Sequence, residues 1–153
     1  MKNILQIYSP IGTLRLEEDK DGICGLYMLG NTPKEQFQWS TSLLWEAKTQ
    51  LDEYFAGKRK EFDLPLAPKG TEFQIRTWAA LRTIPYGETW SYKQLAQAAG
   101  SPKGYRAVGM ANNRNPISII VPCHRVIGSD GSLVGFGGGL DAKRFLLEME
   151  KKH

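Results

Sequence analysis

The first thirty residues carry three short runs of apolar and β-branched side chains, a pattern typical of strands. The runs cover 4–8, 12–16 and 23–29. Turn-forming residues separate them, Ser9-Pro10 after the first run and 19–22 (Asp-Lys-Asp-Gly) after the second. Because these connections are short, we expect an antiparallel meander.

A helical pattern follows the strands. Within 41–56, apolar side chains recur at helical spacing, and Gly57 supplies a stop. The stretch 64–70 has no period and contains two prolines, so we interpret it as a linker. The sequence therefore predicts two domains, 1–68 and 69–153.

The second half opens with three predicted helices. The first begins at Thr71 and ends near Pro85, the second runs from Ser91 to Gly100, and the third from Ser101-Pro102 to Asn115-Pro116. The first two begin with capping-box patterns, in which a hydroxyl residue precedes a glutamine by three positions. Two short helices separated by a Gly-Ser turn have the outline of a helix-turn-helix.

Short strands and a last helix complete the pattern. We expect a buried strand at 117–121, a hairpin between 125–127 and 132–134 that would form a wing, and a helix over 140–151. The glycine-rich run 135–139 lacks the Lys-Ser/Thr of a nucleotide P-loop. It is either a loop that closes on a ligand or a plain connection.

Composition narrows the class of protein. With 153 residues, 41% of them hydrophobic, the chain can bury a core as one domain or two small ones. It lacks an apolar run long enough to span a bilayer, and its start lacks a signal-peptide pattern. Two cysteines are too few for a disulfide scaffold, so we expect a cytoplasmic protein.

Charge is unevenly divided between the halves. Residues 1–68 hold 8 Lys/Arg and 10 Asp/Glu, whereas 69–153 hold 12 and 6. Five basic residues and no carboxylate lie between Trp90 and Ile127, over the predicted helix-turn-helix. This excess indicates a polyanionic partner, although an unevenly charged surface without a partner explains it equally well.

The pair Cys123-His124 is the most unusual candidate for chemistry. A thiol becomes a good nucleophile when a neighbouring base or cation favours the thiolate. Adjacent side chains in an extended segment point in opposite directions, so His124 would reach Cys123 only through a turn or a bridging water. The alternative is a small buried Cys123 beside a satisfied core histidine. Cys24, in a predicted strand, is expected to be structural, and the Cys and His positions lack zinc-site spacing.

At these residues the chain resembles the O6-alkylguanine-DNA alkyltransferases, also called methylated-DNA–protein-cysteine methyltransferases. Pro122-Cys123-His124-Arg125-Val126 is similar to their active-site signature, and 91–96 to their tyrosine-bearing helix. Residues 106–111, Asn115-Pro116, 138–140 and 146–150 also fit, so the resemblance covers about 71–150. It implies an α+β fold in which a small ribonuclease-H-like domain, an antiparallel sheet with a helix, precedes a winged helix-turn-helix domain.

The resemblance also implies a reaction. Cys123 would take an alkyl group, irreversibly and once per protein, from O6 of guanine, and also from O4 of thymine, in a base rotated out of double-stranded DNA. His124 would accept the thiol proton through water, Glu150 would orient the imidazole, Asn115 would hold the active-site turn, and Tyr92 would assist rotation and donate to the leaving guanine. No cofactor or metal is implied, and we expect a monomer that is nucleoid-associated if prokaryotic.

Two further sets of residues are assigned by the resemblance. Arg106 would fill the space left in the duplex, and the DNA contacts would come from Tyr92, Arg106, Ala107, Gly109, Ala111, Asn112, Arg114 and Arg125. The substrate pocket would be formed by Ser118, Val126, Leu133, Val134, Gly137 and Gly138. The backbone carbonyls of Cys123 and Val126 would accept from the exocyclic amine of the guanine, and the Gly137 amide would approach O6. Ser118, Val134 and Gly137 depart from proline, glycine and serine in some members, which would alter tolerance for bulky alkyl groups.

Two other hypotheses stay open from the sequence alone. The chain could be a non-catalytic DNA-binding protein that marks lesions or regulates transcription. Alkyltransferase-like proteins of that kind lack the reactive cysteine, so Cys123 argues against this class. A cysteine hydrolase is the third hypothesis, but such enzymes usually draw their histidine from a distant segment, and here only the terminal His153 is distant.

Overall fold

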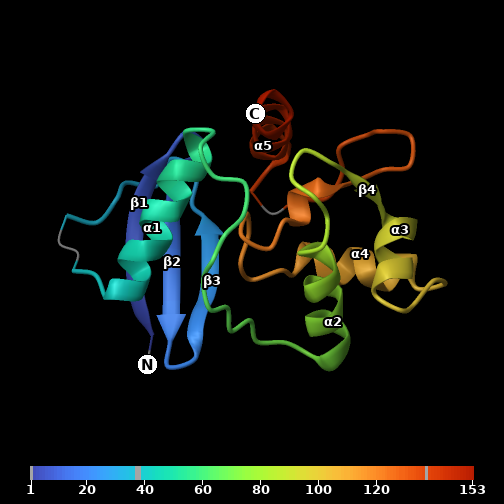
Figure 1. The fold of residues 1–153 in the computed structure, drawn as a ribbon, viewed down its shortest axis with the longest axis horizontal. Helices are drawn as coiled ribbons and strands as arrows, with labels where there is room; N and C mark the ends of the chain where they lie inside the picture. Colours follow the sequence, from blue (N-terminus) through green and yellow to red (C-terminus); the bar gives the residue numbers. More distant parts are fainter. Residues whose placement is uncertain (1, 37–38, 137) are drawn as a thin grey trace.

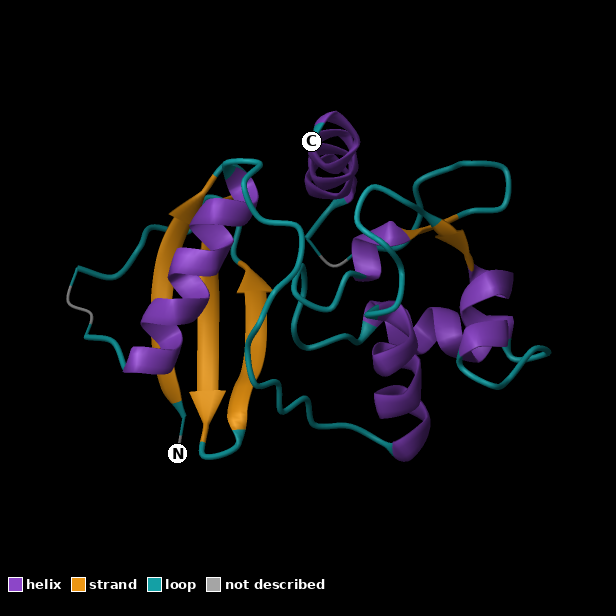
Figure 2. Ribbon diagram, viewed as in Figure 1, coloured by secondary structure: helices purple, strands orange, loops and turns teal. Residues whose placement is uncertain are grey.

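The computed structural model describes residues 2–36, 39–136 and 138–153. Figures 1 and 2 show a sheet with one helix on the left and a group of helices on the right. The sheet has the order β1-β2-β3, with β1 at Asn3–Ser9, β2 at Gly12–Asp19 and β3 at Gly22–Met28. Both pairings are antiparallel, which confirms the predicted meander.

Helix α1, Ser42–Phe55, lies across one face of this sheet (Figure 1). The Thr41 hydroxyl caps it by accepting from the Leu44 amide at 3.2 Å. Leu44, Leu51 and Tyr54 are fully buried, and their helical spacing turns one stripe toward the strands. Burying each such side chain stabilises the fold by roughly 1.5–3 kcal/mol, so packing rather than helix propensity holds α1 in place.

The linker docks on the outer edge of β3. The Ile23 amide donates to the Pro65 carbonyl at 2.9 Å, and the Ala67 amide donates to the Ile23 carbonyl at 2.7 Å. Further along the same strand, the Leu26 amide donates to the Pro116 carbonyl at 2.9 Å. The strand edge is therefore covered by the linker and by a segment from the second half, which ties the two halves together.

Three helices of the second half pack against one another, as Figure 1 shows. They are α2 at Glu72–Leu81, α3 at Tyr92–Ala98 and α4 at Tyr105–Asn113. Both predicted capping boxes are present, at the start of α2 and of α3. Helices α3 and α4 form the expected helix-turn-helix.

Three local expectations were wrong. Helix α4 starts at Tyr105 rather than 101, because the Gly104 amide donates to the Ser101 carbonyl at 2.7 Å and closes a turn there. The stretch 117–121 is a turn with one isolated bridge rather than a strand. Strand β5, Val126–Ile127, pairs in parallel with β4, Trp90–Ser91, instead of forming a hairpin with 132–134.

The last helix, α5 at Leu140–Lys152, lies between the two groups and is seen nearly end-on at the top of Figure 1. Its buried face carries Leu146 and Met149, which join a core shared by both halves. The same face also carries two charged residues, Lys143 and Glu150. In the described residues, no helix combines the length and the apolar character needed to cross a membrane.

Candidate active site

Cys123 begins a single 3-10 turn, Cys123–Arg125, and is only 4% exposed. It lines a cavity of about 350 Å³, called here the Cys123 cavity. The other walls come from β3, from the end of α4 and the turn after it, and from the loop before α5; they include Tyr27, Met28, Asn112, Asn115, Ser118, Gly135, Phe136 and Gly138. The thiol therefore lies at the base of a recess to which both halves of the chain contribute.

Asn115 holds the turn that leads to Cys123. Its side-chain amide donates to the Val121 carbonyl at 2.8 Å, and its carbonyl oxygen accepts from the Ile117 amide at 3.0 Å. Between these anchors Ile119 has φ 72°, a conformation that costs a β-branched residue of order 1–3 kcal/mol. These bonds bend a stretch of apolar residues that would otherwise favour a strand.

His124 has two different nitrogen environments. Its Nε2 lies 2.7 Å from Glu150 Oε2, and the ring is fully buried. Its Nδ1 is buried and has no hydrogen-bond partner among the described residues. With Nε2–H donating to the carboxylate, Nδ1 carries the free lone pair. Burial lowers the pKa of His124, against the influence of Glu150, so a neutral ring is available as a proton acceptor.

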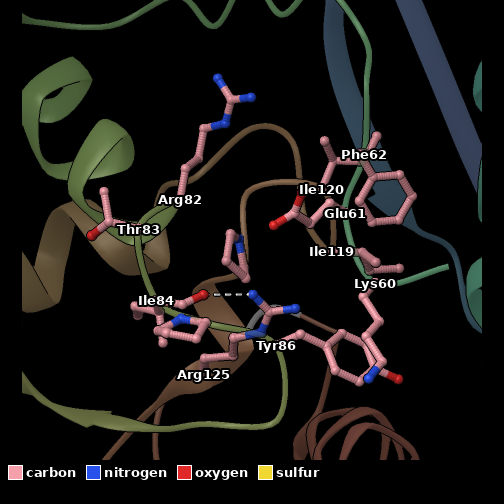
Figure 3. Close-up of a pocket in the computed structure, with 12 residues that line it drawn as sticks. Lys60, Glu61, Phe62, Arg82, Thr83, Ile84, Tyr86, Ile119, Ile120 and Arg125 are labelled. Carbon is pink, nitrogen blue, oxygen red and sulfur yellow. Dashed lines mark hydrogen bonds between the residues drawn. The ribbon is translucent and has the colours of Figure 1, made fainter. Parts of the chain in front are cut away.

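Arg125 fixes Glu150 from the other side. Arg125 Nε donates to Glu150 Oε1 at 2.8 Å, and Nη2 donates to Oε2 at 3.1 Å. Nη1 donates to the Ile84 carbonyl at 2.8 Å, the dashed line in Figure 3. Burial alone would raise the pKa of Glu150, but His124 and Arg125 hold it at about 2. The carboxylate is therefore an anion held by charge-assisted bonds.

The expected DNA contact by Arg125 was wrong. The residue is 6% exposed, and its guanidinium lies in the wall of a separate cavity of about 370 Å³, between Ile84 and Tyr86 (Figure 3). Its carbon ζ is 5.6 Å from the centre of the Tyr86 ring. Arg125 was expected at the surface as one of the five basic residues between Trp90 and Ile127, whereas its side chain in the 3-10 turn is buried.

The thiol of Cys123 is in an environment that favours its protonated form. Burial raises its pKa, while Asn115, Lys143 and Ser118 oppose that effect. A protonated thiol is a weak nucleophile, so reaction needs a base, and His124 is the adjacent candidate.

Sequence reasoning missed Lys143. It is fully buried, and its Nζ donates to the Val126 carbonyl at 2.5 Å and to the Val134 carbonyl at 2.8 Å. Burial lowers the pKa of Lys143, and Cys123 opposes the shift. The signal was available: Lys143, Leu146 and Glu150 share one face of α5, so a lysine interrupts its apolar stripe.

Tyr92, the first residue of α3, is half-buried beside α4. A Cβ atom at Gly109 would lie 3.5 Å from its ring, so the glycine lets the ring pack against α4. Burial and the neighbouring Cys123 raise the pKa of Tyr92. Its hydroxyl therefore stays protonated at neutral pH and can donate a hydrogen bond.

Helix α4 presents only part of its predicted DNA-contact set to solvent. Arg106, Ala107 and Arg114 are exposed, and Gly109 is half-buried. Two assignments were wrong, since Ala111 is 3% and Asn112 1% exposed. The Ala111 carbonyl accepts from Trp78, and the Asn112 amide donates to the Cys123 carbonyl. Helical periodicity turns these two residues inward, Ala111 toward α2 and Asn112 toward the cysteine, rather than toward a duplex.

The predicted pocket is also only partly assembled. Ser118 and Gly138 line the Cys123 cavity, whereas Gly137 lies outside the described residues. Leu133 lines a different cavity, of about 420 Å³, beside α5. The expected group at Val126 is its backbone carbonyl, which here accepts from Lys143 Nζ, and Val134 is 41% exposed.

Leu133 therefore lies away from the Cys123 cavity, whereas the roles expected of Val126 and Val134 stay predictions. Met28 and Phe136 line the Cys123 cavity without having been predicted. In the described part of the chain, no group of three His, Cys, Asp or Glu side chains is placed to hold a metal ion.

Two family models and several curated relatives match this chain. Residues 72–152 match the family model described as "6-O-methylguanine DNA methyltransferase, DNA binding domain". Residues 6–68 match "6-O-methylguanine DNA methyltransferase, ribonuclease-like domain". A methylated-DNA–protein-cysteine methyltransferase of Methanosarcina barkeri is 50% identical over 151 residues, 96% of each chain. One from Mycobacterium leprae is 52% identical over 146 residues, 94% of this chain and 88% of the relative.

Solved structures give the same result. The crystal structure of the Mycobacterium tuberculosis O6-methylguanine methyltransferase superposes with a TM-score of 0.88 at 48% identity, covering 99% of this chain and 94% of that one. The same organism's protein in complex with DNA gives 0.88 at 49% identity, over 98% and 93%. These matches confirm the two-part α+β fold expected from the resemblance. This chain belongs to the 6-O-methylguanine DNA methyltransferase family.

Proposed function

We propose that this protein repairs double-stranded DNA by transferring an alkyl group from O6 of guanine to Cys123, once per molecule. One observation carries the proposal. A buried thiol at the base of a cavity is followed by a histidine whose Nδ1 is free and whose Nε2 is held by a carboxylate. That arrangement suits deprotonation of a thiol. Exposed Arg106 lies on α4, and exposed Arg114, at the C-cap of α4, lines the same cavity as Cys123.

The proposed step balances in bonds and protons. The thiol proton passes to His124 Nδ1, directly or through one water, and the thiolate sulfur attacks the alkyl carbon. A carbon–sulfur bond forms as the bond between that carbon and guanine O6 breaks. The electron pair leaves with the guanine, which takes up a proton from solvent, and His124 returns the thiol proton to solvent. We assign Tyr92 as a hydrogen-bond donor to the leaving base. The thioether has no activated leaving group, so the protein is consumed.

The base must leave the duplex to reach the thiol. An O6-alkyl carbon inside a stacked pair cannot approach a sulfur atom at the base of a recess. We propose that α4 enters the minor groove and that Arg106 occupies the space the nucleotide leaves. Arg106 on α4 and Arg114 at its C-cap are both exposed, which supports a contact with phosphates as well.

Replacing the nucleophile tests this function. Cys123→Ala should accept no labelled methyl group from duplexes containing O6-methylguanine, while its affinity for the duplex stays within about twofold of wild type. Cys24→Ala is the matched control, because Cys24 is also a free buried cysteine and lies in β3. Transfer of label to Cys123→Ala would show that the acceptor is elsewhere. Wild-type protein that binds the lesion without taking up label would favour a non-catalytic lesion binder.

Two further proposals accompany the function. The first is a domain boundary between residues 68 and 69, supported by the linker that runs along β3 before α2 begins. The second is that the protein acts as a monomer in the cytoplasm, where a reducing environment keeps Cys123 available for reaction. The free state of both cysteines is compatible with that compartment.

A further inference from the structure

A tyrosine from the first half of the chain reaches the carboxylate of the active site. Tyr54, on the buried stripe of α1, is fully buried. Its hydroxyl donates to Glu150 Oε2 at 2.5 Å, across 96 residues of sequence. Tyr54 is one of the side chains that recur at helical spacing within 41–56, a pattern that indicates core packing alone.

The oxygen atom that Tyr54 contacts is the same one that holds the histidine. Glu150 Oε2 lies 2.7 Å from His124 Nε2 and also accepts from Arg125 Nη2 at 3.1 Å. Glu150 Oε1 accepts from Arg125 Nε at 2.8 Å and from the Gly87 amide at 3.5 Å. Arg125 alone would allow the carboxylate to tilt about the guanidinium. A donor from a different element restricts that tilt and aligns Oε2 with the imidazole.

Packing around the ring does not require this hydrogen bond. Tyr54 packs against three aromatic rings, with centroids 5.4 Å away at Phe55, 5.3 Å at Phe62 and 6.3 Å at Tyr86. Tyr86, in the same cluster, has a buried hydroxyl without a hydrogen-bond partner in the described residues. The cluster therefore tolerates a hydroxyl that makes no bond. A phenylalanine at position 54 would keep the packing and lose only the bond to Glu150.

We propose that Tyr54 is a positioning residue for alkyl transfer, through which α1 orients the Glu150–His124 pair that deprotonates Cys123. The inference rests on the proposed function. It assigns to the first half of the chain a part in the chemistry, beyond supporting the second half. It also explains why the buried face of α5 carries a carboxylate where it meets α1.

Tyr54→Phe tests this role, and Tyr86→Phe is the matched control, since it removes a hydroxyl from the same cluster. Single-turnover transfer from an O6-methylguanine duplex separates three quantities: the amplitude gives the folded, competent fraction, the half-saturating DNA concentration gives binding, and the rate at saturating DNA gives chemistry. Alkylation of Cys123 by iodoacetamide, followed across pH by peptide mass spectrometry, gives a second reading that does not involve DNA.

We expect Tyr54→Phe to lower the transfer rate at saturating DNA about tenfold, because it loses a hydrogen bond to a charged group. The amplitude and the half-saturating DNA concentration should stay at the wild-type values. Glu150 Oε2 would lose one of its donors and become more basic toward His124. The limb of the iodoacetamide pH profile that reports His124 should then move to higher pH. The other charged and titratable groups around the pair, Arg125, Lys143, Cys123 and Tyr86, are unchanged in this variant.

Three outcomes would overturn the role of Tyr54. The first is a wild-type rate and pH profile in Tyr54→Phe. The second is a loss confined to amplitude, which would indicate a structural residue. The third is an equal loss of rate in Tyr86→Phe. Should the wild-type protein transfer no alkyl group, the proposed function fails instead, and the iodoacetamide profiles of the two variants still decide whether Tyr54 influences the thiol.

Discussion

Replacing Arg125 by methionine tests whether this residue forms a buried ion pair or contacts DNA. The side chain makes three hydrogen bonds, two to Glu150 and one to the Ile84 carbonyl, and is 6% exposed. Methionine fills much of the same volume but donates nothing. The substitution therefore leaves Glu150, itself 2% exposed, as a buried anion that has lost its cationic partner.

The cost follows from that isolated charge. Removing one partner of a buried ion pair typically destabilises a protein by about 3–5 kcal/mol. For a chain of about 150 residues, each kcal/mol corresponds to a fall in Tm of about 2–4 °C. We therefore expect Arg125→Met to lower Tm by about 10 °C and to slow alkyl transfer, because the carboxylate that holds His124 loses its anchor.

The pH dependence of folding stability tests the same ion pair independently. The pKa of Glu150 is about 2 in the folded protein, below its ordinary value of 4.5. A lowered pKa contributes stability that is fully present above pH 4.5 and is lost as pH falls toward 2. Without Arg125 the pKa rises and this contribution shrinks. The difference in stability between wild type and variant should thus be largest above pH 4.5 and should narrow below it.

Thermal unfolding and fluorescence binding to a duplex measure the two effects, with Arg114→Met as the matched control. Arg114 is exposed directly after α4, at its C-cap, and its replacement changes the net charge by the same amount. We expect Arg114→Met to weaken DNA binding and leave Tm unchanged. The reasoning is refuted if Arg125→Met keeps the wild-type Tm and weakens DNA binding as much as Arg114→Met does.

Three other predictions concern the same site. Asn115→Ala removes the hydrogen bonds to Val121 and Ile117, so the free energy of unfolding should fall by about 1–3 kcal/mol and alkyl transfer should slow. An unchanged denaturant midpoint together with an unchanged transfer rate would contradict the role of Asn115 in holding the turn. Lys143→Met should raise the pKa of the Cys123 thiol further, because burial already raises it and the lysine charge opposes that effect; a thiolate absorbance titration measures this, and a lower pKa in the variant would contradict it. Because burial lowers the pKa of His124 below 6.5, the transfer rate should stay level from neutrality to pH 6.5 and drop only below it. The unfolded chain takes up that proton first, so stability should also decline below pH 6.5, and a rate that already halves above this pH would refute the assignment of a neutral His124 as base.

The elements that the sequence predicted are those with strong local signals. The meander has turn residues between its strands, and α2 and α3 each begin with a capping box that the structure contains. The apolar stripes of α1 and α5 fix which face is buried. In each case the information lies within a few neighbouring residues, so local physical chemistry is sufficient.

The errors come from contacts that hydrophobic periodicity and turn composition do not encode. The stretch 117–121 has the composition of a strand, but the Asn115 side chain bends it and β3 takes only an isolated bridge with Ile117. Strand β5 pairs with β4, some 35 residues earlier, rather than with its neighbour. The Ser101-Pro102 pair resembles a helix start yet lies in a turn before α4. Local pattern did not distinguish these cases.

For the candidate site too, some residues could be named from the sequence and others could not. Cys123, His124, Asn115 and Glu150 were named from a motif, and the structure brings them together around one turn. Arg125 was misplaced because a 3-10 turn decides its direction. Tyr54 could not be assigned to the site from sequence, since its partner is 96 residues away. Lys143 was detectable as a charge on an apolar helical face.

Mass spectrometry of the intact protein tests the central claim most directly. Wild-type protein would be mixed with an excess of duplex containing O6-methylguanine, and the product would be digested to locate the modification. The account predicts a mass gain of one methylene unit per chain, located on Cys123. One guanine in the duplex should be restored to its unmodified form for each protein consumed. No mass gain, a modification at another residue, or repair of many lesions per protein would contradict it.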